Sequence, residues 1–195
     1  MKKLIGLTGK TGAGKTTICK YLKEKGAYII DGDIVARQVL EDDKTLLIEL
    51  NNAFGGVLNE DGTLNRRALA SKAFCDEEST SKLNSIIHPA INIAIEKEAG
   101  IAFKDYDIVV VDAAAIIESG FADKCDIMLV VTAPFDVRKD RIIKRDDLSE
   151  NDALVRMNGQ KADEFYLSRA DFVIKNYEPY DVQTQMKSIE KELFS

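Results

Sequence analysis

Short runs of apolar residues, many of them β-branched, recur along the chain and are separated by longer segments with helical periodicity. Such runs are typical of strands that are buried on both faces of a parallel sheet. The predicted strands are Leu4–Leu7, Tyr28–Ile30, Ile108–Val111, Ile127–Val131 and Phe172–Ile174. The helical patterns occupy Thr16–Lys25, a long stretch at about 34–100, Phe135–Lys144 and Val182–Leu193. This alternation predicts an α/β fold, with a doubly wound, five-stranded parallel sheet flanked by helices.

The interval between the second and third predicted strands is unusually long for a single crossover connection. Its helical patterns are interrupted by a turn-rich segment from Gly55 to Gly62. We therefore expect a mostly helical insertion at about 34–100. Because connections at the carboxyl edge of a parallel sheet overhang the ligand crevice, a substrate-binding role is favoured. A helical elaboration that only supports the fold is the alternative.

The bulk composition is that of one ordinary globular domain, spanning 1–195. The 195 residues are 45% hydrophobic and 31% charged, which is enough for a single core. A formal net charge of −6 argues against nucleic acid or an anionic membrane as the main partner. The sequence has no run of about 18 apolar residues that would predict a membrane span, no signal-peptide pattern, and three widely spaced cysteines that suit neither disulfides nor zinc. We expect a cytoplasmic protein and leave its oligomeric state open.

A glycine-rich segment joins the first predicted strand to the first predicted helix. Its sequence from Gly9 to Thr16 matches the phosphate-loop pattern G-x-x-x-x-G-K-[ST] in the strand-to-helix context that the pattern requires. Glycines let backbone N–H groups converge on phosphate oxygens, the lysine reaches the β and γ phosphates, and the threonine can ligate Mg²⁺. The segment predicts a phosphate-loop NTPase fold that binds ATP and Mg²⁺, with Thr16 at the metal. The expected phosphate contacts are Gly12, Ala13, Gly14, Lys15, Thr16 and Thr17.

The phosphate loop by itself leaves several classes of nucleotide-binding protein open. A GTPase is disfavoured, because the guanine-reading tetrapeptide N-K-x-D does not occur in the sequence. A large ATPase motor would usually be longer than 195 residues. A small-molecule kinase remains, and a nucleotide-binding regulatory module without turnover is the alternative from another class.

Carboxylates follow two of the predicted strands at their carboxyl ends. Asp31 and Asp33 come after the second strand, and Asp112 comes after the third. A carboxylate at this edge can accept a proton from an attacking hydroxyl or hold Mg²⁺ through water. An aspartate here also suits the start of a helix, so we assign the chemistry to Asp33 and a supporting role to Asp31. For Asp112, a place beside the metal and an ordinary strand end are both open.

Basic side chains gather on the helix that is predicted after the fourth strand. Arg138, Arg141 and Arg145 are spaced three and four residues apart and therefore share one face. In a phosphoryl-transfer enzyme such arginines can close over ATP and neutralise the developing charge. A solvated surface whose arginines pair with nearby aspartates is the alternative. Because a phosphate loop precedes them, we expect a lid at about 136–160.

Several further segments, taken in order with the phosphate loop, resemble the dephospho-coenzyme A kinase family. They are Asp31–Arg37 with the form D-x-D-x-x-A-R, Gly62–Leu69 with the form G-T-L-x-R-R-x-L, Leu83-Asn84 through His88-Pro89, Glu118, Arg145-Asp146, and Arg156-Met157 through Gln160. The resemblance spans almost the whole chain. The chain departs from the family pattern at Lys10, Ala13 and Thr16 of the loop, at Ala114 to Ile117, and at Arg138, where glutamine is frequent.

The resemblance implies phosphorylation of the ribose 3′-hydroxyl of dephospho-CoA by MgATP, the last step of coenzyme A synthesis. It implies a core, a helical CoA-binding subdomain and a lid. By position, it makes Asp33 the general base and Lys15 a catalytic ligand of the ATP phosphates. It places substrate contacts at Thr8, Asp33, Arg37, Arg66 and His88, and it assigns Arg141 to catalysis and Arg145 to ATP binding from the lid. Without the resemblance, His88 has no partner constellation in the sequence and suits a structural role.

Overall fold

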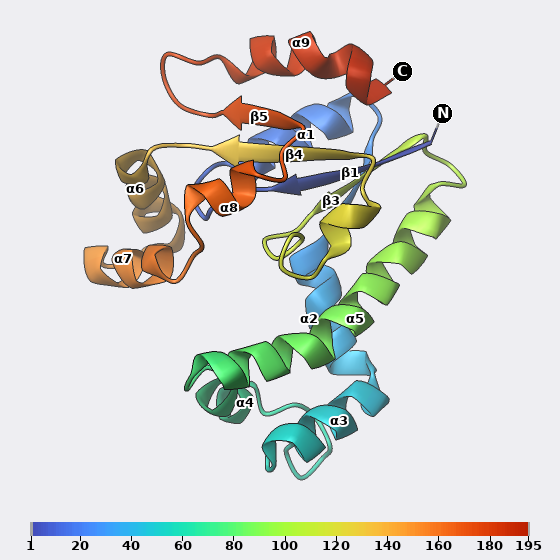
Figure 1. Cartoon of the computed structure of the whole chain (residues 1–195), viewed down its shortest axis with the longest axis vertical. Helices are drawn as coiled ribbons and strands as arrows, with labels where there is room; N and C mark the ends of the chain where they lie inside the picture. Colours follow the sequence, from blue (N-terminus) through green and yellow to red (C-terminus); the bar gives the residue numbers. More distant parts are fainter. Residues whose placement is uncertain (1, 195) are drawn as a thin grey trace. The chain divides into compact units, whose positions relative to one another are not determined.

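The computed structural model of the chain describes residues 2–194, in which strands and helices alternate (Figure 1). The strands are β1 (Lys3–Thr8), β2 (Tyr28–Asp31), β3 (Ile108–Asp112), β4 (Ile127–Thr132) and β5 (Phe172–Lys175). The α-helices are α1 (Lys15–Glu24), α2 (Gly32–Asp42), α3 (Lys44–Phe54), α4 (Arg66–Ala73), α5 (Glu77–Ala102), α6 (Phe135–Asp146), α7 (Glu150–Asn158), α8 (Asp163–Leu167) and α9 (Val182–Phe194). A 3₁₀ helix, η1 (Phe121–Lys124), precedes β4. The five strands predicted from the apolar runs are all present.

The strands form one parallel sheet in the order β2-β3-β1-β4-β5, which confirms the predicted fold class. Because all strands run the same way, their carboxyl ends share one edge of the sheet. The register pairs Asp112 with both Leu7 and Asp31, and it pairs Thr132 with Lys175. β1 lies at the centre, where the strand order changes direction, and such switch points are where open α/β sheets bind ligands.

Two helices cover one face of this sheet with a continuous apolar core. The core joins alternate residues of the strands to the inward faces of α1 and α9, and its fully buried members include Ile5, Leu7, Val110, Leu129, Ile18, Leu22, Met186 and Leu193. On the opposite face, the segment between β3 and β4 approaches closely. A Cβ atom at Gly6 would meet the side chains of Met128, Cys125 and Ile116, so the strand needs glycine at this position.

The described chain divides into two compact units. One, here called the core unit, comprises the chain up to Asp31 and from Ala99 onward, and it contains the sheet. The other, here called the inserted unit, is Gly32–Glu98 and contains α2, α3, α4 and most of α5.

The inserted unit has an apolar core of its own, formed by residues of α2, α3, α4 and α5, among them Leu46, Leu50, Leu69 and Leu83. Side-chain caps begin two of its helices. Asp43 accepts hydrogen bonds from the N–H groups of Thr45 and Leu46, and Asn65 accepts one from Ala68. Such caps satisfy N–H groups that have no partner within the helix.

Within the core unit, α6 and α7 form a helical hairpin with a small apolar cluster. Ile142 of α6 packs with Ala153 and Met157 of α7, and Asp147 makes the turn in the left-handed conformation. Ser149 caps α7 through the N–H of Asp152. No helix within residues 2–194 is both long and apolar enough to cross a membrane.

Candidate active site

The phosphate loop connects β1 to α1 through three glycines with positive φ angles. Gly9, Gly12 and Gly14 have φ values of 149°, 79° and 94°, in a region that side chains with a Cβ rarely adopt. Space excludes a Cβ as well, because one at Gly12 would lie 2.6 Å from the Arg138 carbonyl oxygen. Gly14 stands at the N-cap position of α1, so the loop delivers the positive end of that helix to the site.

The outer side of the loop is held by a side chain of α6 and by the residue that follows β5. Arg141 donates to the carbonyl oxygens of Gly12 and Ala13, each at 3.3 Å, and to that of Asn176 at 2.9 Å. Asn176 donates from Nδ2 to the carbonyls of Ala13 at 2.9 Å and Gly14 at 3.4 Å. The loop carbonyls are therefore bound on the outside.

The peptide groups of Thr11 are held on both sides. The Thr11 N–H donates to Oε1 of Gln160 at 3.0 Å, and the Thr11 carbonyl accepts from Nη1 of Arg138 at 3.4 Å. Arg138 is buried, with 6% of its surface exposed, and its Nε donates to the carbonyl of Ala133. Desolvation lowers the pKa of the Arg138 guanidinium, and the neighbouring Asp163 and Tyr166 oppose that shift. Arg138 thus lies inside the protein, and the solvated alternative does not describe it.

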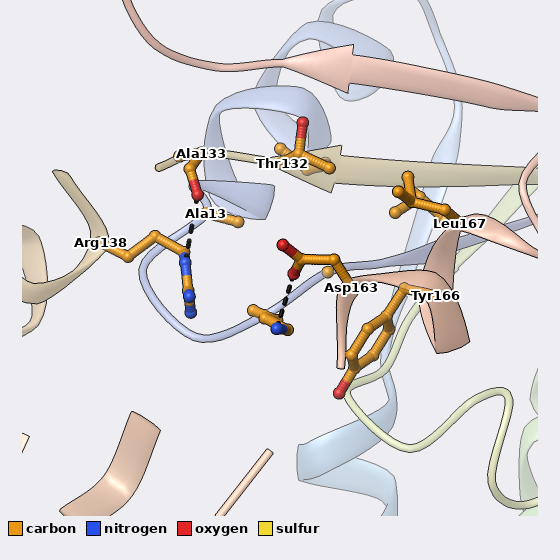
Figure 2. A pocket seen from close by; sticks show the side chains of 11 residues that line it. Ala13, Thr132, Ala133, Arg138, Asp163, Tyr166 and Leu167 are labelled. Carbon is orange, nitrogen blue, oxygen red and sulfur yellow. Dashed lines mark hydrogen bonds and ion pairs between the residues drawn. The ribbon is translucent and has the colours of Figure 1, made fainter. Parts of the chain in front are cut away.

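A small pocket lies beside the first half of the loop (Figure 2). Its wall combines the loop, the end of β4, the start of α6 and the short helix α8, and it is lined by Gly9, Lys10, Ala13, Val130 to Ala133, Arg138, Asp163, Tyr166 and Leu167. Lys10 forms an ion pair of 2.6 Å with Asp163. The lysine that departs from the family pattern therefore ties the loop to α8.

A second charged group lies at the end of β3. Nζ of Lys15 is 3.7 Å from Oδ1 of Asp112, and the Cys19 thiol donates to Oδ2 of the same carboxylate at 3.3 Å. Burial and the negative charge of Asp112 raise the pKa of Cys19, so this thiol stays protonated and donates. The structure thus brings Asp112 next to the phosphate-loop lysine.

The candidate metal ligand, Thr16, and its neighbour Thr17 lie in the first turn of α1, and both are exposed. Residues 2–194 contain no group of three or more histidine, cysteine or acidic side chains that could hold a metal by themselves. Mg²⁺ in phosphoryl-transfer sites is commonly held by the substrate phosphates, water and one or two protein oxygens. The residues around the loop fit that mode of binding.

Thr8, predicted to contact the substrate, ends β1 and is fully buried. Its hydroxyl donates to the carbonyl of Ala114 at 3.4 Å. The hydroxyl thereby connects β1 to the segment after β3 in which the chain departs from the family pattern.

The other predicted substrate residues lie in the inserted unit. Asp33 stands in the first turn of α2, and Arg37 lies one turn further along the same helix; both are exposed. Arg66 begins α4 and pairs with Glu41 of α2 at 3.0 Å. Because Glu41 is four residues after Arg37, the ion pair brings Arg66 to the face of α2 that carries Arg37. His88 is half-buried on α5, and burial lowers its pKa.

Arg145, predicted to act from a lid, is hydrogen-bonded within the α6–α7 hairpin. Its Nε and Nη2 each lie 2.7 Å from an oxygen of Asp146, which also accepts from Arg156 at 2.6 Å. These contacts lower the pKa of Asp146, with the hydrogen bond from Arg145 as the largest cause. Of the three arginines that share a face by sequence, two contact the phosphate loop and the third joins this exposed network.

Comparison of the sequence with known proteins shows the family to which the chain belongs. The sequence profile of the dephospho-CoA kinase family matches residues 3–181. The chain belongs to that family. A dephospho-CoA kinase of Corynebacterium jeikeium is 44% identical over 178 residues, which cover 88% of this chain and 89% of the relative. A dephospho-CoA kinase of Deinococcus radiodurans is 38% identical over 178 residues, covering 91% of this chain and 85% of the relative.

Solved structures agree with membership of the dephospho-CoA kinase family. The protein TT1252 from Thermus thermophilus superposes with a TM-score of 0.82 at 27% identity, covering 100% of this chain and 99% of its own. A dephospho-CoA kinase from Campylobacter jejuni gives a TM-score of 0.70 at 26% identity, covering 99% of this chain and 98% of its own. A shikimate kinase from Acinetobacter baumannii, with a TM-score of 0.53 at 15% identity, shares the fold.

Sequence reasoning missed three residues that this dephospho-CoA kinase family member places at its phosphate loop. Neither Asn176 nor Asp163 was singled out from the sequence, and Gln160 was part of a motif that carries the family resemblance but had no assigned role. For Asn176 the sequence did contain a usable signal. The residue directly follows the last predicted strand and so lies at the same carboxyl edge of the sheet as the phosphate loop. For Gln160 and Asp163, which lie near the expected end of the lid, we find no such signal in the sequence.

Proposed function

We propose that this chain transfers the γ-phosphoryl group of ATP to the ribose 3′-hydroxyl of dephospho-CoA, giving coenzyme A and ADP. The proposal rests on a phosphate loop whose carbonyls accept hydrogen bonds from side chains outside the loop, in a chain whose residues 3–181 match the dephospho-CoA kinase family. Phosphoryl transfer needs little covalent chemistry from the protein. Positioning and charge neutralisation supply most of the rate.

On the nucleotide side, Lys15 and the segment from Gly12 to Thr17 bind the ATP phosphates. In this segment, the N–H groups of Ala13 and Thr17 already donate to the carbonyls of Lys10 and Gly14. Thr16 is the proposed protein ligand of Mg²⁺, which neutralises charge on the β and γ phosphate oxygens when it is bound. Asp112, 3.7 Å from Lys15, orients the lysine and lies where it could receive a metal-bound water. The Asp112 contact orients Lys15, and the hydrogen bonds to the loop carbonyls order the loop. Both groups therefore need little reorganisation during phosphoryl transfer.

On the acceptor side, Asp33 is the proposed general base, which takes the proton of the 3′-hydroxyl as that oxygen attacks phosphorus. Arg37 of α2 and Arg66 of α4, which the ion pair with Glu41 brings to the same face of α2, carry positive charge that suits the diphosphate of dephospho-CoA. His88 completes the proposed acceptor contacts of the inserted unit. Thr8 is fully buried with its hydroxyl on the Ala114 carbonyl, so its proposed role on the acceptor side is to support the segment after β3. This assignment makes the inserted unit the acceptor-binding part of the enzyme, in line with the expectation for the insertion at about 34–100.

From the α6–α7 hairpin, Arg141 is proposed to stabilise charge on the transferring phosphoryl group. Its guanidinium donates to two loop carbonyls at 3.3 Å on the outside of the loop, so it would have to exchange these contacts for phosphate oxygens when the lid closes. Arg145 is proposed to leave Asp146 for ATP when the lid at about 136–160 closes. Both arginines would thus exchange a contact within the protein for a contact with the phosphates on binding.

The proposed location is the cytoplasm, where ATP and reduced thiols prevail. The cysteines are free in the structure, as that location requires. The proposed partners are ATP and dephospho-CoA, without nucleic acid or a membrane.

The test is ADP release by the purified protein with MgATP and a panel of acceptors. Dephospho-CoA should stimulate release many-fold, and mass spectrometry should place the new phosphate on the ribose. Coenzyme A is the matched control, because its 3′-position already carries phosphate, and it should give no stimulation. If another nucleotide or small alcohol stimulates release while dephospho-CoA is inert, the acceptor assignment is wrong. ATP binding with no acceptor-dependent turnover would favour a regulatory module.

A further inference from the structure

We propose that Asn176 is a positioning residue for the nucleotide half of the reaction, and that its side chain sets the direction of the phosphate-binding N–H groups. The proposal rests on the function proposed above and adds a residue to it. Asn176 follows β5 directly and lies 163 residues from Ala13 in the sequence, yet its amide nitrogen is 2.9 Å from the Ala13 carbonyl oxygen.

Hydrogen bonds hold the backbone of Asn176 at both its N–H and its carbonyl group. Its N–H donates to the carbonyl of Thr132, the last residue of β4, at 2.9 Å. Its carbonyl accepts from Nη2 of Arg141 at 2.9 Å. Anchored to the sheet edge on one side and to α6 on the other, the residue presents its amide nitrogen to the loop from a rigid base.

The geometry of the peptide group converts these contacts into an orientation. A trans peptide is planar, with its N–H and C=O pointing in opposite directions. The carbonyl of Ala13 shares its peptide with the N–H of Gly14, and the carbonyl of Gly14 shares its peptide with the N–H of Lys15. Asn176 binds both carbonyls, at 2.9 and 3.4 Å. Holding these oxygens outward turns the two N–H groups to the opposite side, where the phosphates bind.

Packing shows that the amide is seated against the loop. A Cβ atom at Gly14 would overlap Nδ2 of Asn176, so the glycine is required by this contact as well as by its φ of 94°. Arg141 also donates to the Ala13 carbonyl, at 3.3 Å. Loss of the Asn176 amide would therefore leave the Ala13 carbonyl to Arg141 and the Gly14 carbonyl to the Thr17 N–H, which donates to it at 3.1 Å, so the larger loss falls on the peptide that carries the Gly14 N–H.

The discriminating variants are Asn176→Asp and Asn176→Ala. Asp keeps the shape of Asn but replaces the donor with an oxygen that repels both carbonyls and the nucleotide phosphates. Ala removes the donor without adding repulsion. We expect the dissociation constant of MgADP to rise about tenfold in Asn176→Ala and about a hundredfold in Asn176→Asp, with the KM for ATP following the same order. The KM for dephospho-CoA should stay within about twofold.

The matched control is Asn52→Asp, the same change at an exposed position of α3 in the inserted unit, which should leave nucleotide binding unaltered. Thermal unfolding of each variant without nucleotide separates positioning from packing. A residue that only fills space would tolerate the isosteric Asp better than Ala. Nucleotide affinity in that reverse order, or affinity unchanged in both variants, would overturn the proposal.

The test of Asn176 by MgADP binding does not depend on the identity of the acceptor. MgADP titration requires neither dephospho-CoA nor turnover, so an inactive wild type that binds MgADP would contradict the proposed function and still test Asn176. If Asn176→Asp does not fold, the comparison of Asn176→Ala with wild type decides. Nucleotide affinity within about twofold of wild type would then count against the positioning role.

Discussion

In the core unit, side chains from three segments distant in the sequence hold the phosphate loop, whereas in the inserted unit the predicted acceptor residues stand on helix surfaces. Arg138 and Arg141 of α6 and Asn176 after β5 bind loop carbonyls at distances between 2.9 and 3.4 Å, and Gln160 accepts from the Thr11 N–H at 3.0 Å. By contrast, Asp33, Arg37 and Arg66 are exposed. The nucleotide side is thus organised before ligand arrives, and the acceptor side is expected to order around its ligand.

The largest expected effect breaks catalysis on the acceptor side and spares the nucleotide side. Asn at position 33 cannot take a proton, so Asp33→Asn should lower kcat about a thousandfold while MgADP affinity stays within about twofold. Steady-state kinetics and nucleotide titration measure the two quantities. Asp42→Asn, at the other end of the same helix, is the matched control and should behave like wild type. Full activity of Asp33→Asn would remove the residue from the role of base.

The next effect compares the two units through their thiols. Cys75 of the inserted unit is exposed, whereas burial raises the pKa of Cys125 in the core unit from 9.0 to about 12 and also raises that of Cys19. The thiolate is the form that reacts with a disulfide reagent. Near pH 8 the exposed Cys75 should therefore react rapidly, and Cys19 and Cys125 should react at least about a hundredfold more slowly.

Cys75→Ser should remove the fast phase, and denaturant should make the remaining thiols react alike. A fast phase that survives in Cys75→Ser would show that the core unit opens near α1 or η1 on the labelling timescale, contrary to the preset nucleotide side.

A smaller effect sharpens the acceptor assignment. Arg66→Ala should raise the KM for dephospho-CoA about tenfold and leave the KM for ATP unchanged, because a charge-assisted contact to the acceptor is lost. Arg67→Ala changes the adjacent exposed arginine of the same helix and controls for charge and helix propensity. Equal effects from the two substitutions would indicate a general attraction for the anionic acceptor rather than a specific contact.

The smallest effect concerns the pH dependence of stability. Burial lowers the pKa of His88 below its ordinary 6.5, so between these values the unfolded chain binds the proton more readily than the folded chain. The folded state therefore loses stability as pH falls through about 6.5, and it retains it above. His88→Asn should remove this dependence. The difference in Tm between wild type and variant should shift in favour of the wild type by about 1–2 °C from pH 5.5 to 7.5.

His88 is the single histidine of the chain, so other imidazoles do not contribute to the difference. A difference in Tm that is constant with pH would mean that His88 titrates alike in both states.

The sequence by itself determined the elements and the chemistry of the loop. Apolar runs of β-branched residues specify buried strands because only a doubly covered sheet removes such runs from water, and all five strands appeared where these runs lie. The glycines of the loop are equally local, since positive φ angles at Gly12 and Gly14 exclude most other residues. The ordered motifs, from the loop to Gln160, were sufficient to indicate the family.

Only the tertiary structure decided which side chains hold the loop. The contacts of Asn176 and Gln160 with it span 163 and 149 residues, and no periodicity within a helix or strand encodes such pairs. The arginines of α6 illustrate the same limit, because their spacing predicts a shared face but does not determine that Arg138 is buried and Arg145 exposed. Burial depends on what packs against a face, and in this protein that neighbour is supplied by strand order at the carboxyl edge of the sheet.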